Sequence, residues 1–219
     1  KGAESAKESI NEIKDSLKGS DMVFICAGMG GGTGTGSAPV VARVAKEQGS
    51  IVIGTVTMPF KIERARVDKA EFGLQQLRQV SDTVIVIDNN RLVAIAGDLP
   101  IQQAFAVANE LIATMIKGIV ETIAIPSLVN LDFADVKAIM TNGGVAAIGV
   151  GASDTNNKVE EAVKGALSNP LLDISYAGAT GALIHVSGGP DLTLEEISRV
   201  GELVTESLDD DANVIWGAR

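Results

Sequence analysis

A run of glycines interrupted by hydroxyl side chains is the stretch of this sequence best suited to chemistry. Six of the nine residues from 28 to 36 are glycine, and the run reads Gly30-Gly31-Gly32-Thr33-Gly34-Thr35-Gly36 at its centre. Without Cβ atoms, the backbone N–H groups of such a run can turn toward a single point. An apolar, strand-like run at 22–27 precedes it, and a helix is predicted after it, beginning near Ser37 and continuing through 39–45.

A loop that joins a strand to the N-terminus of a helix favours anions, because unpaired N–H groups and the positive end of the helix dipole face the same point. The usual anion at such a loop is a phosphate group. The hydroxyls of Thr33, Thr35 and Ser37 can add hydrogen bonds to phosphate oxygens. A tight turn that binds nothing is the structural alternative, although a turn needs only one or two glycines.

Two common phosphate loops do not fit this run. A P-loop ends in Gly-Lys-Ser/Thr, whereas Gly36-Ser37-Ala38 contains no lysine. The dinucleotide fingerprint needs glycines at positions i, i+2 and i+5, and no register of the run provides them. The second predicted strand also ends in Met58-Pro59 instead of the acidic residue that binds a ribose. A Rossmann-type oxidoreductase is therefore disfavoured.

The composition excludes several classes of protein. The net charge is 18 − 28 = −10, which argues against a nucleic-acid-binding surface. Cys26 is the single cysteine, so a disulfide framework is excluded. We find neither an apolar run of membrane-spanning length nor a signal peptide, and we expect a cytoplasmic protein without direct membrane insertion. The chain begins at Lys1 inside an apparent helix, and we expect it to be a fragment of a longer protein.

The elements that must position the glycine loop alternate between helices and strands. The first half is predicted to contain, in order, a helix at 3–18, a strand at 22–27, the helix after the loop, a strand at 50–57, a helix at 63–78 and a strand at 83–88. Strands that are apolar throughout and alternate with helices predict a parallel sheet with both faces covered. Ligands of such sheets bind beyond the carboxyl ends of the strands.

A long helix, Ile101 to Ala124, is predicted to connect two lobes, and it would be about 36 Å long at 1.5 Å per residue. The elements predicted beyond it are helices at 133–140 and 158–167, strands at 146–150 and 182–187, a helix from Thr193 with Glu196 as its capping box, and a strand at 214–216. The predicted fold class is therefore α/β: a Rossmann-like parallel-sheet domain at 1–98, a central connecting helix at 99–125 and a smaller α+β domain at 126–219.

A second group of polar side chains, Asn130, Asp132 and Asp135, lies just past the long helix. The two aspartates are three residues apart at a helix start, so both carboxylates can face one side. Capping of the helix and compensation of its dipole would explain the spacing without any catalysis. Two acids beside a γ-phosphate would instead orient and polarise an attacking water.

The glycine run at 30–36 resembles the signature loop of the tubulin and FtsZ GTPases, and the flanking residues at 21–25 and 38–42 are similar to FtsZ. The group at 130–135 resembles the motif that FtsZ inserts into the nucleotide pocket of the next subunit. The resemblance covers essentially all 219 residues, and the chain is identified as a member of the FtsZ family, archaeal in character and missing both ends. It implies a tubulin/FtsZ-like GTP-binding domain at 1–98 and a C-terminal GTPase-activating domain at 126–219.

The resemblance also implies roles for individual residues. The phosphates of GTP or GDP would bind to Gly30, Gly31, Gly32, Thr33, Gly34, Thr35 and Gly36. The segment Met58-Pro59-Phe60 with Glu63 is similar to the one that contacts the ribose, and a one-residue deletion leaves Arg66 or Arg64 as the arginine of that motif. Asn89 matches the polar residue after the third strand, and Phe105 matches an aromatic residue beside the base. Asn109 stands at the position where the family usually has an aspartate that accepts hydrogen bonds from guanine. An ordinary helix face is the alternative for Phe105 and Asn109.

The function implied by the resemblance is a GTPase that polymerises head to tail into filaments of the cell-division ring. Asp132, Asp135 and Asn130 would complete the active site of the adjacent subunit, and Mg²⁺ would offset the charge on the phosphates. Partners would be further copies of the chain, division proteins and a membrane tether reached through the missing tail, at the division site. The alternative is a tubulin-like nucleotide-binding scaffold or cell-shape protein that hydrolyses little.

Three conspicuous features are expected to have structural roles only. His185 lies in an apolar strand without a His or Cys partner and is predicted to be a packed core histidine. The run Asp209-Asp210-Asp211 lacks the alternation of a calcium loop and is predicted to be a solvated helix end. Gly178-Ala179-Thr180-Gly181 is predicted to be a turn before a buried strand. A protein-bound metal site is not predicted.

Overall fold

The computed structural model describes residues 1–125, 129, 132–141, 144–168 and 175–219. These residues form two compact units. The first comprises Lys1–Asn109 and Met140–Ala146, and the second comprises the described residues of 110–139, 147–169 and 174–219. The division falls within the long helix α6 (Ile101–Ala124).

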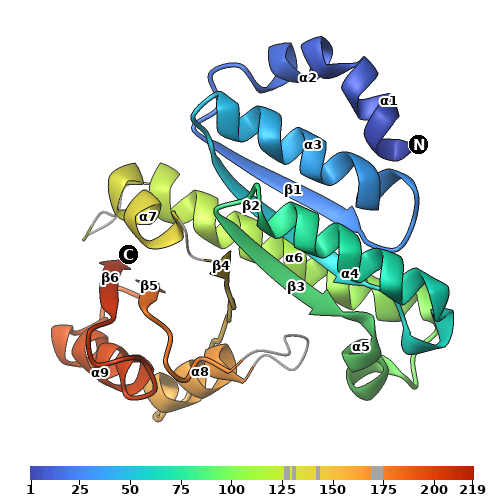
Figure 1. Cartoon of the computed structure of the whole chain (residues 1–219). Coiled ribbons are helices and arrows are strands. Elements are labelled where there is room, and N and C mark those ends of the chain that lie inside the picture. The colour runs from blue at the N-terminus through green and yellow to red at the C-terminus, as the bar shows by residue number, and fades with distance from the viewer. Residues whose placement is uncertain (126–128, 130–131, 142–143, 169–174) are drawn as a thin grey trace. The chain divides into compact units, whose positions relative to one another are not determined.

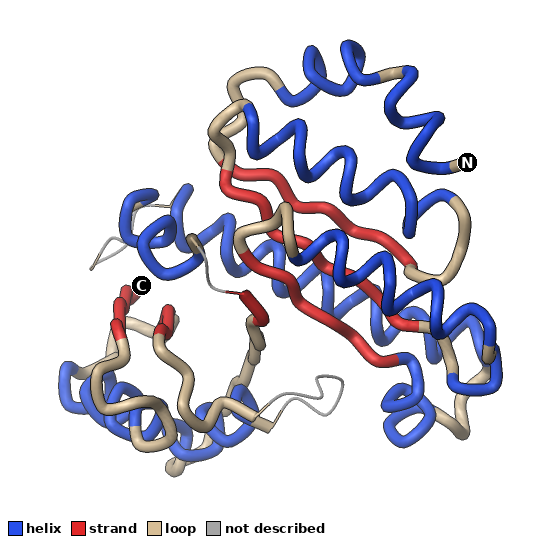
Figure 2. The backbone as a smooth tube through the Cα atoms, in the orientation of Figure 1, coloured by secondary structure: helices blue, strands red, loops and turns tan. Residues whose placement is uncertain are grey.

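The first unit is a parallel sheet with helices (Figures 1 and 2). Its elements are α1 (Gly2–Glu8), α2 (Ile10–Leu17), β1 (Met22–Gly28), α3 (Thr33–Glu47), β2 (Ile51–Met58), the 3₁₀ turn η1 (Lys61–Glu63), α4 (Ala65–Arg78), β3 (Thr83–Asp88), α5 (Asn89–Ala96) and β4 (Gly144–Val145). The strands pair in the order β1-β2-β3-β4, and every pair is parallel. The predicted α/β fold class with a parallel sheet is therefore confirmed.

The main core of this unit lies between the sheet and the helices α3 and α4, which cover the same face in Figure 1. Val52 and Val56 of β2 are fully buried there, together with Ala42 of α3 and Leu77 of α4. Because the alanine side chain is small, α3 can approach the strands closely. Aromatic side chains are scarce in this chain, so closely packed aliphatic residues fill the core. These contacts fix α3, and with it the end of the glycine loop, over the sheet.

A buried carboxylate fixes the far ends of the same elements. Asp82, just before β3, is almost completely buried, and its Oδ2 accepts a hydrogen bond from the N–H of Val52 at 2.9 Å. Lys46 of α3 forms an ion pair with its other oxygen. A buried carboxylate needs such partners, and this one ties α3, β2 and β3 together at the edge opposite the glycine loop.

The second unit contains α7 (Phe133–Met140), α8 (Lys158–Leu167), β5 (Gly181–Val186), α9 (Leu194–Thr205) and β6 (Asn213–Ala218). The two strands pair in parallel, and α8 packs against α9. The predicted capping box of α9 is confirmed, since the N–H of Glu196 donates to Thr193 Oγ1 at 3.2 Å and the N–H of Thr193 donates to Glu196 Oε2 at 2.9 Å.

Some predicted elements differ from the observed ones. The first helix breaks at Ser9 into α1 and α2, and the predicted strand at 146–150 is replaced by the two-residue β4 at 144–145. The helix after the second strand begins at Ala65, because Lys61–Glu63 forms a separate 3₁₀ turn. The helix α5 was not predicted at all.

The long helix α6 has the predicted bounds and is also apolar and long enough to cross a membrane by length and composition alone. The expectation that no apolar run reaches this length is therefore wrong. Its sequence nevertheless includes Glu110 and an ion pair between Lys117 and Glu121 at 3.7 Å. Charged residues are costly at the centre of a bilayer, and the core helix of a soluble protein passes the same test of length and composition.

The histidine, the aspartate run and the glycine turn that stand out in the sequence all lie in the second unit. His185 is half-buried in β5, and its Nδ1 has no hydrogen-bond partner in the described part of the chain. Burial, helped by the nearby charge of Arg219, lowers the pKa of this imidazole. Asp209 Oδ1 accepts from the N–H of Asp211 in a turn, and Gly178 has a φ of 75° in the turn before β5.

Candidate nucleotide-binding site

The glycine loop lies between β1 and α3, and the helix begins earlier than predicted. It starts at Thr33 instead of near Ser37, so that the second half of the glycine run forms the first turn of α3 and Pro39 lies inside the helix. The N–H groups without intrahelical acceptors are therefore those of the glycine-threonine segment itself. The positive end of the dipole is directed at the same segment.

The glycines of the loop fall into two groups. A Cβ at Gly30, which has a φ of 96°, would lie 2.8 Å from the carbonyl oxygen of Arg66, and one at Gly34 would lie 2.5 Å from that of Gly28. These two positions need glycine because another part of the backbone comes too close. Gly31 and Gly32, in contrast, face open space within the described part of the chain. Close packing therefore does not explain these two glycines, and their exposed backbone leaves room for a ligand.

The three hydroxyls around the loop are used differently. Thr35 Oγ1 accepts a hydrogen bond from the N–H of Gly30 at 2.8 Å, which closes the loop on itself. Ser37 Oγ donates to the carbonyl oxygen of Thr33 at 2.7 Å. The hydroxyl of Thr33 has no partner among the residues described, so it is the hydroxyl most available to a ligand.

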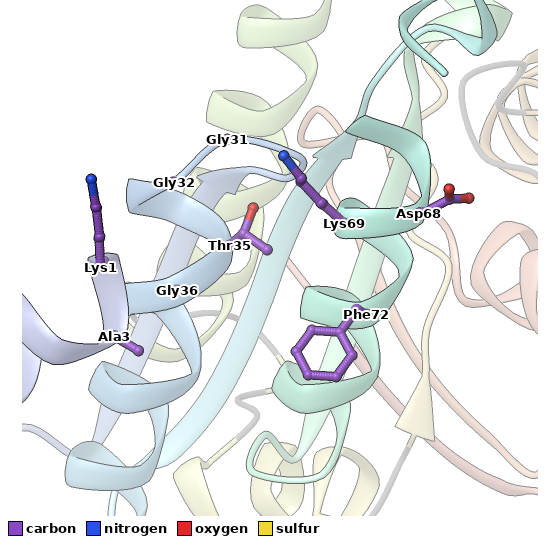
Figure 3. Close-up of a pocket in the computed structure, with 10 residues that line it drawn as sticks. Lys1, Ala3, Gly31, Gly32, Thr35, Gly36, Asp68, Lys69 and Phe72 are labelled. Atoms are coloured by element: carbon purple, nitrogen blue, oxygen red, sulfur yellow. The ribbon is translucent and has the colours of Figure 1, made fainter. Parts of the chain in front are cut away.

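An open pocket of about 390 Å³ adjoins the loop (Figure 3). It is lined by Gly31, Gly32, Lys1, Asp68, Lys69 and other residues of α1, α3 and α4. Figure 3 shows Lys69 reaching from α4 toward the glycine loop. Two lysines beside one aspartate give this rim a net positive charge, which suits an anion.

The segment after β2 packs against the glycine loop, because Gly30 lies against the backbone of Arg66 and the ring of Pro59. Glu63 holds this segment in shape. Its Oε1 accepts from the N–H of Phe60 at 3.0 Å, and its Oε2 forms an ion pair with Arg66 at 2.8 Å. Arg64 instead has a φ of 41°, in the left-handed region that a residue with a Cβ adopts only under strain. Of the two candidate arginines, Arg66 is therefore the one that Glu63 positions.

Aromatic residues connect this segment to the start of α6. The rings of Phe60 and Phe105 meet edge to face, with centroids 6.1 Å apart. Phe105 remains 38% exposed, so part of its ring is accessible to another planar group. Asn109 lies one helical turn further along α6 and is exposed.

The end of β3 supplies the last part of the site. Asn89 is the half-buried first residue of α5, and Asp88 caps that helix by accepting from the N–H of Asn90 at 2.8 Å. Asn90, which sequence reasoning missed, also binds the segment after β2 through its side chain. The sequence Asp88-Asn89-Asn90 before an apolar run is an N-cap signal, and it could have revealed α5, although not the contact of Asn90 with Lys61.

The strand register explains why these residues lie together. Gly28 is opposite Thr57, and Met58 is opposite Asp88, so the carboxyl ends of β1, β2 and β3 are level. The glycine loop, the segment after β2 and the start of α5 follow these ends directly. The first unit therefore brings the predicted phosphate and ribose contacts together at the edge where parallel sheets bind ligands, and Phe105 reaches the same segment through its contact with Phe60.

The predicted catalytic residues belong to the second unit, and Asn130 lies outside the described residues. Asp132 and Asp135 cap the start of α7 reciprocally: the N–H of Asp135 donates to Asp132 Oδ1 at 2.8 Å, and the N–H of Asp132 donates to Asp135 Oδ2 at 3.2 Å. Each carboxylate thus keeps one oxygen outside the capping box. Within the described part of the chain, no group of three or more His, Cys, Asp or Glu side chains forms a metal site.

A parallel α/β sheet with a glycine-rich loop at its carboxyl edge is typical of phosphate-binding proteins. Comparison with known proteins shows which family of this class the chain belongs to. Residues 1–97 match the GTPase domain of the Tubulin/FtsZ family, and residues 144–219 match the C-terminal domain of the FtsZ family. The chain belongs to the tubulin/FtsZ family.

Relatives and solved structures agree with this assignment. The chain is 61% identical to "Cell division protein FtsZ 2" of Methanocaldococcus jannaschii, and the match covers 100% of this chain and 58% of the relative. It is 56% identical to the protein of the same name from Halobacterium salinarum, over 94% of this chain and 53% of that relative. A solved structure described as "FtsZ dimer, empty (M. jannaschii)" matches with a TM-score of 0.90 and 52% identity, over 99% of this chain and 64% of that one. The chain thus spans little more than half the length of these curated relatives.

Proposed function

We propose that the protein containing this chain binds and hydrolyses GTP, and that it polymerises head to tail into filaments of the cell-division ring. The observation that carries the proposal is the open backbone of Gly31 and Gly32 at the N-terminus of α3. The hydroxyl of Thr33, which has no partner among the described residues, lies beside them. Close packing does not account for glycine at these positions, whereas binding of phosphates to the backbone N–H groups does. The GTPase domain of the matched family and the names of the relatives support the same function.

Guanine is the proposed base, with Phe105 beside it and Asn109 accepting a hydrogen bond from it. The half-exposed ring of Phe105 and the exposed amide of Asn109, on successive turns of α6, support this arrangement. A carboxamide has one acceptor oxygen, whereas an aspartate has two. We therefore expect a preference for GTP over ATP that Asn109→Asp would increase. A wild-type preference for ATP would contradict the choice of guanine.

Hydrolysis is proposed to need Asn130, Asp132 and Asp135 of a neighbouring copy. The chain separates these residues from Phe105 by most of α6, which is about 36 Å long, and the outward oxygens of the capping box remain available to polarise water. Mg²⁺ bound to the phosphates would offset negative charge during the reaction. The Thr33 hydroxyl at the start of α3 is an oxygen donor of the kind that Mg²⁺ prefers.

A contact of this kind between identical subunits is heterologous and does not close, so it propagates into a filament. The protein would act in the cytoplasm at the division site, with division proteins and a membrane tether bound through segments outside this chain. A solved relative described as a dimer supports self-association.

The alternative is a nucleotide-binding scaffold that hydrolyses little. The reciprocal capping of Asp132 and Asp135 favours it, because it gives both residues a structural role without catalysis. The deciding experiment is the specific GTPase activity of the full-length protein across a dilution series, with sedimentation of polymer at each concentration. We expect activity to rise more than proportionally with concentration. Constant specific activity from dilute monomer upward would contradict the shared site, and polymer without hydrolysis would establish the scaffold.

A further inference from the structure

The turn η1 donates a hydrogen bond to a side chain outside itself. The first N–H groups of any helical turn lack acceptors within the turn. At η1, Glu63 accepts from the N–H of Phe60, and Asn90 Oδ1 accepts from the N–H of Lys61 at 2.9 Å. Asn90 lies 29 residues further along the chain, at the start of α5.

Asn90 is itself held in place by Asp88. Its Nδ2 donates to Asp88 Oδ1 at 2.6 Å, and the same oxygen accepts the backbone N–H of Asn90 at 2.8 Å. The amide orientation is thereby defined, with its donor on the carboxylate and its acceptor on the N–H of Lys61. The chain of contacts Asp88–Asn90–Lys61 ties the end of β3 to the turn after β2.

We infer that Asn90 is a positioning residue for nucleoside binding: by holding the N–H of Lys61, it fixes Phe60 and Glu63 at the carboxyl edge of the sheet. The inference rests on the proposed nucleotide site, in which Phe60 and Glu63 belong to the ribose contact. Phe60 adjoins Lys61 and meets the ring of Phe105, so a displacement of this turn would move the predicted ribose and base contacts together. Among the described residues, Asn90 makes no hydrogen bond to the backbone of the glycine loop, so the proposed phosphate contacts of that loop should be unaffected.

The test uses the full-length protein and separates binding from turnover. Asn90→Ala should weaken GTP and GDP by the same factor, about three- to tenfold for one lost hydrogen bond, and raise KM accordingly. The kcat at saturating GTP should not change. Asn11→Ala, on the exposed surface of α2, is the matched control and should leave both affinities at the wild-type value.

A paired exchange provides the rescue. Asn90→Asp alone places two carboxylates against each other and should weaken binding, whereas Asp88→Asn combined with Asn90→Asp restores a donor facing an acceptor and leaves an oxygen for Lys61. The exchange should recover most of the nucleotide affinity. If Asn90→Ala does not fold, the comparison of Asn90→Asp with the double variant tests the inference instead. A lowered melting temperature with unchanged KM, a loss in kcat alone, or a folded exchange variant without recovery would overturn the inference. Absence of guanine-nucleotide binding by the wild type would instead refute the proposed function and the inference with it.

Discussion

Asp132 and Asp135 each accept a hydrogen bond from the other's backbone N–H, at 2.8 and 3.2 Å, across the first turn of α7. The two carboxylates that would polarise water in a neighbouring active site therefore also hold their own helix together. Mutation to alanine removes both roles at once, so that a loss of activity in such a variant cannot by itself be assigned to catalysis.

Comparison of Asp135→Asn with Asp135→Ala separates the two roles. Asparagine keeps an acceptor for the N–H of Asp132, so we expect a stability close to the wild type, whereas alanine should lower the free energy of unfolding by about 1 kcal/mol. Both variants lose the charge, and both should bind GTP and assemble but hydrolyse about a hundredfold more slowly or worse. Thermal unfolding and GTPase activity at saturating GTP measure these quantities. Wild-type turnover by Asp135→Asn would show that the carboxylate acts only as a cap.

The glycine loop provides a second matched pair. A side chain at Gly32, where φ is −81° and no atom is close, should fit the fold but block phosphates, so Gly32→Val should keep the wild-type melting temperature and weaken GTP binding at least about tenfold. Gly34→Ala places a Cβ 2.5 Å from the carbonyl oxygen of Gly28 and should cost about 1–3 kcal/mol of stability. Calorimetric titration with GTP and thermal unfolding check both. Full GTP affinity in folded Gly32→Val would exclude the loop as the phosphate site.

How far the sequence predicts the fold depends on how local the determinants are. The bounds of β3, α6, α7 and α8 are predicted as observed, because apolar periodicity and flanking breakers define them. The early start of α3 is not predicted, since its first turn contains two glycines, which disfavour helix. Tertiary packing overrides this preference: Gly36 lies against the backbone of Ala3, and Thr35 against Gly73.

In the candidate site, too, features that depend on contacts between distant parts of the chain are not predicted from the sequence. Glycines can be counted in the sequence, but only the structure separates Gly30 and Gly34, which packing requires, from Gly31 and Gly32, which it does not. The contact of Asn90 with Lys61 spans 29 residues, and no local pattern indicates it. The reciprocal caps of Asp132 and Asp135 follow from spacing alone, and the sequence predicts them as one of two alternatives.

The strained backbone of Arg64 predicts a stabilising substitution. Glycine adopts a positive φ without the steric cost that a Cβ brings, and such a residue stores about 1 kcal/mol or more. Arg64→Gly should therefore unfold at a higher urea concentration than Arg64→Ala, which removes the same side chain but keeps the Cβ. Urea unfolding of the two variants isolates the strain, since the lost guanidinium is common to both. Equal stabilities would show that Arg64 is relaxed in solution.

The start of α9 predicts a specific dependence of stability on pH. The hydrogen bond from the N–H of Thr193, and then the contact with Lys158 at 2.9 Å, lower the pKa of Glu196 from its usual 4.5. Since the folded pKa lies below the unfolded one, this stabilisation is complete above about pH 4.5 and is lost as the pH falls through the folded value.

Wild type should therefore be more stable than Glu196→Gln at about pH 7, and the difference should vanish in acid, where the wild-type carboxyl is also neutral. Thermal unfolding of both proteins along a pH series measures this convergence. Glu195→Gln is the control, because Glu195 shares the first turn of α9 but makes no hydrogen bond in the described part of the chain. It should lose only its interaction with the helix dipole, which is weak and sensitive to salt. A difference for Glu196→Gln that persists unchanged into acid would assign the stabilisation to the shape of the side chain instead of its charge.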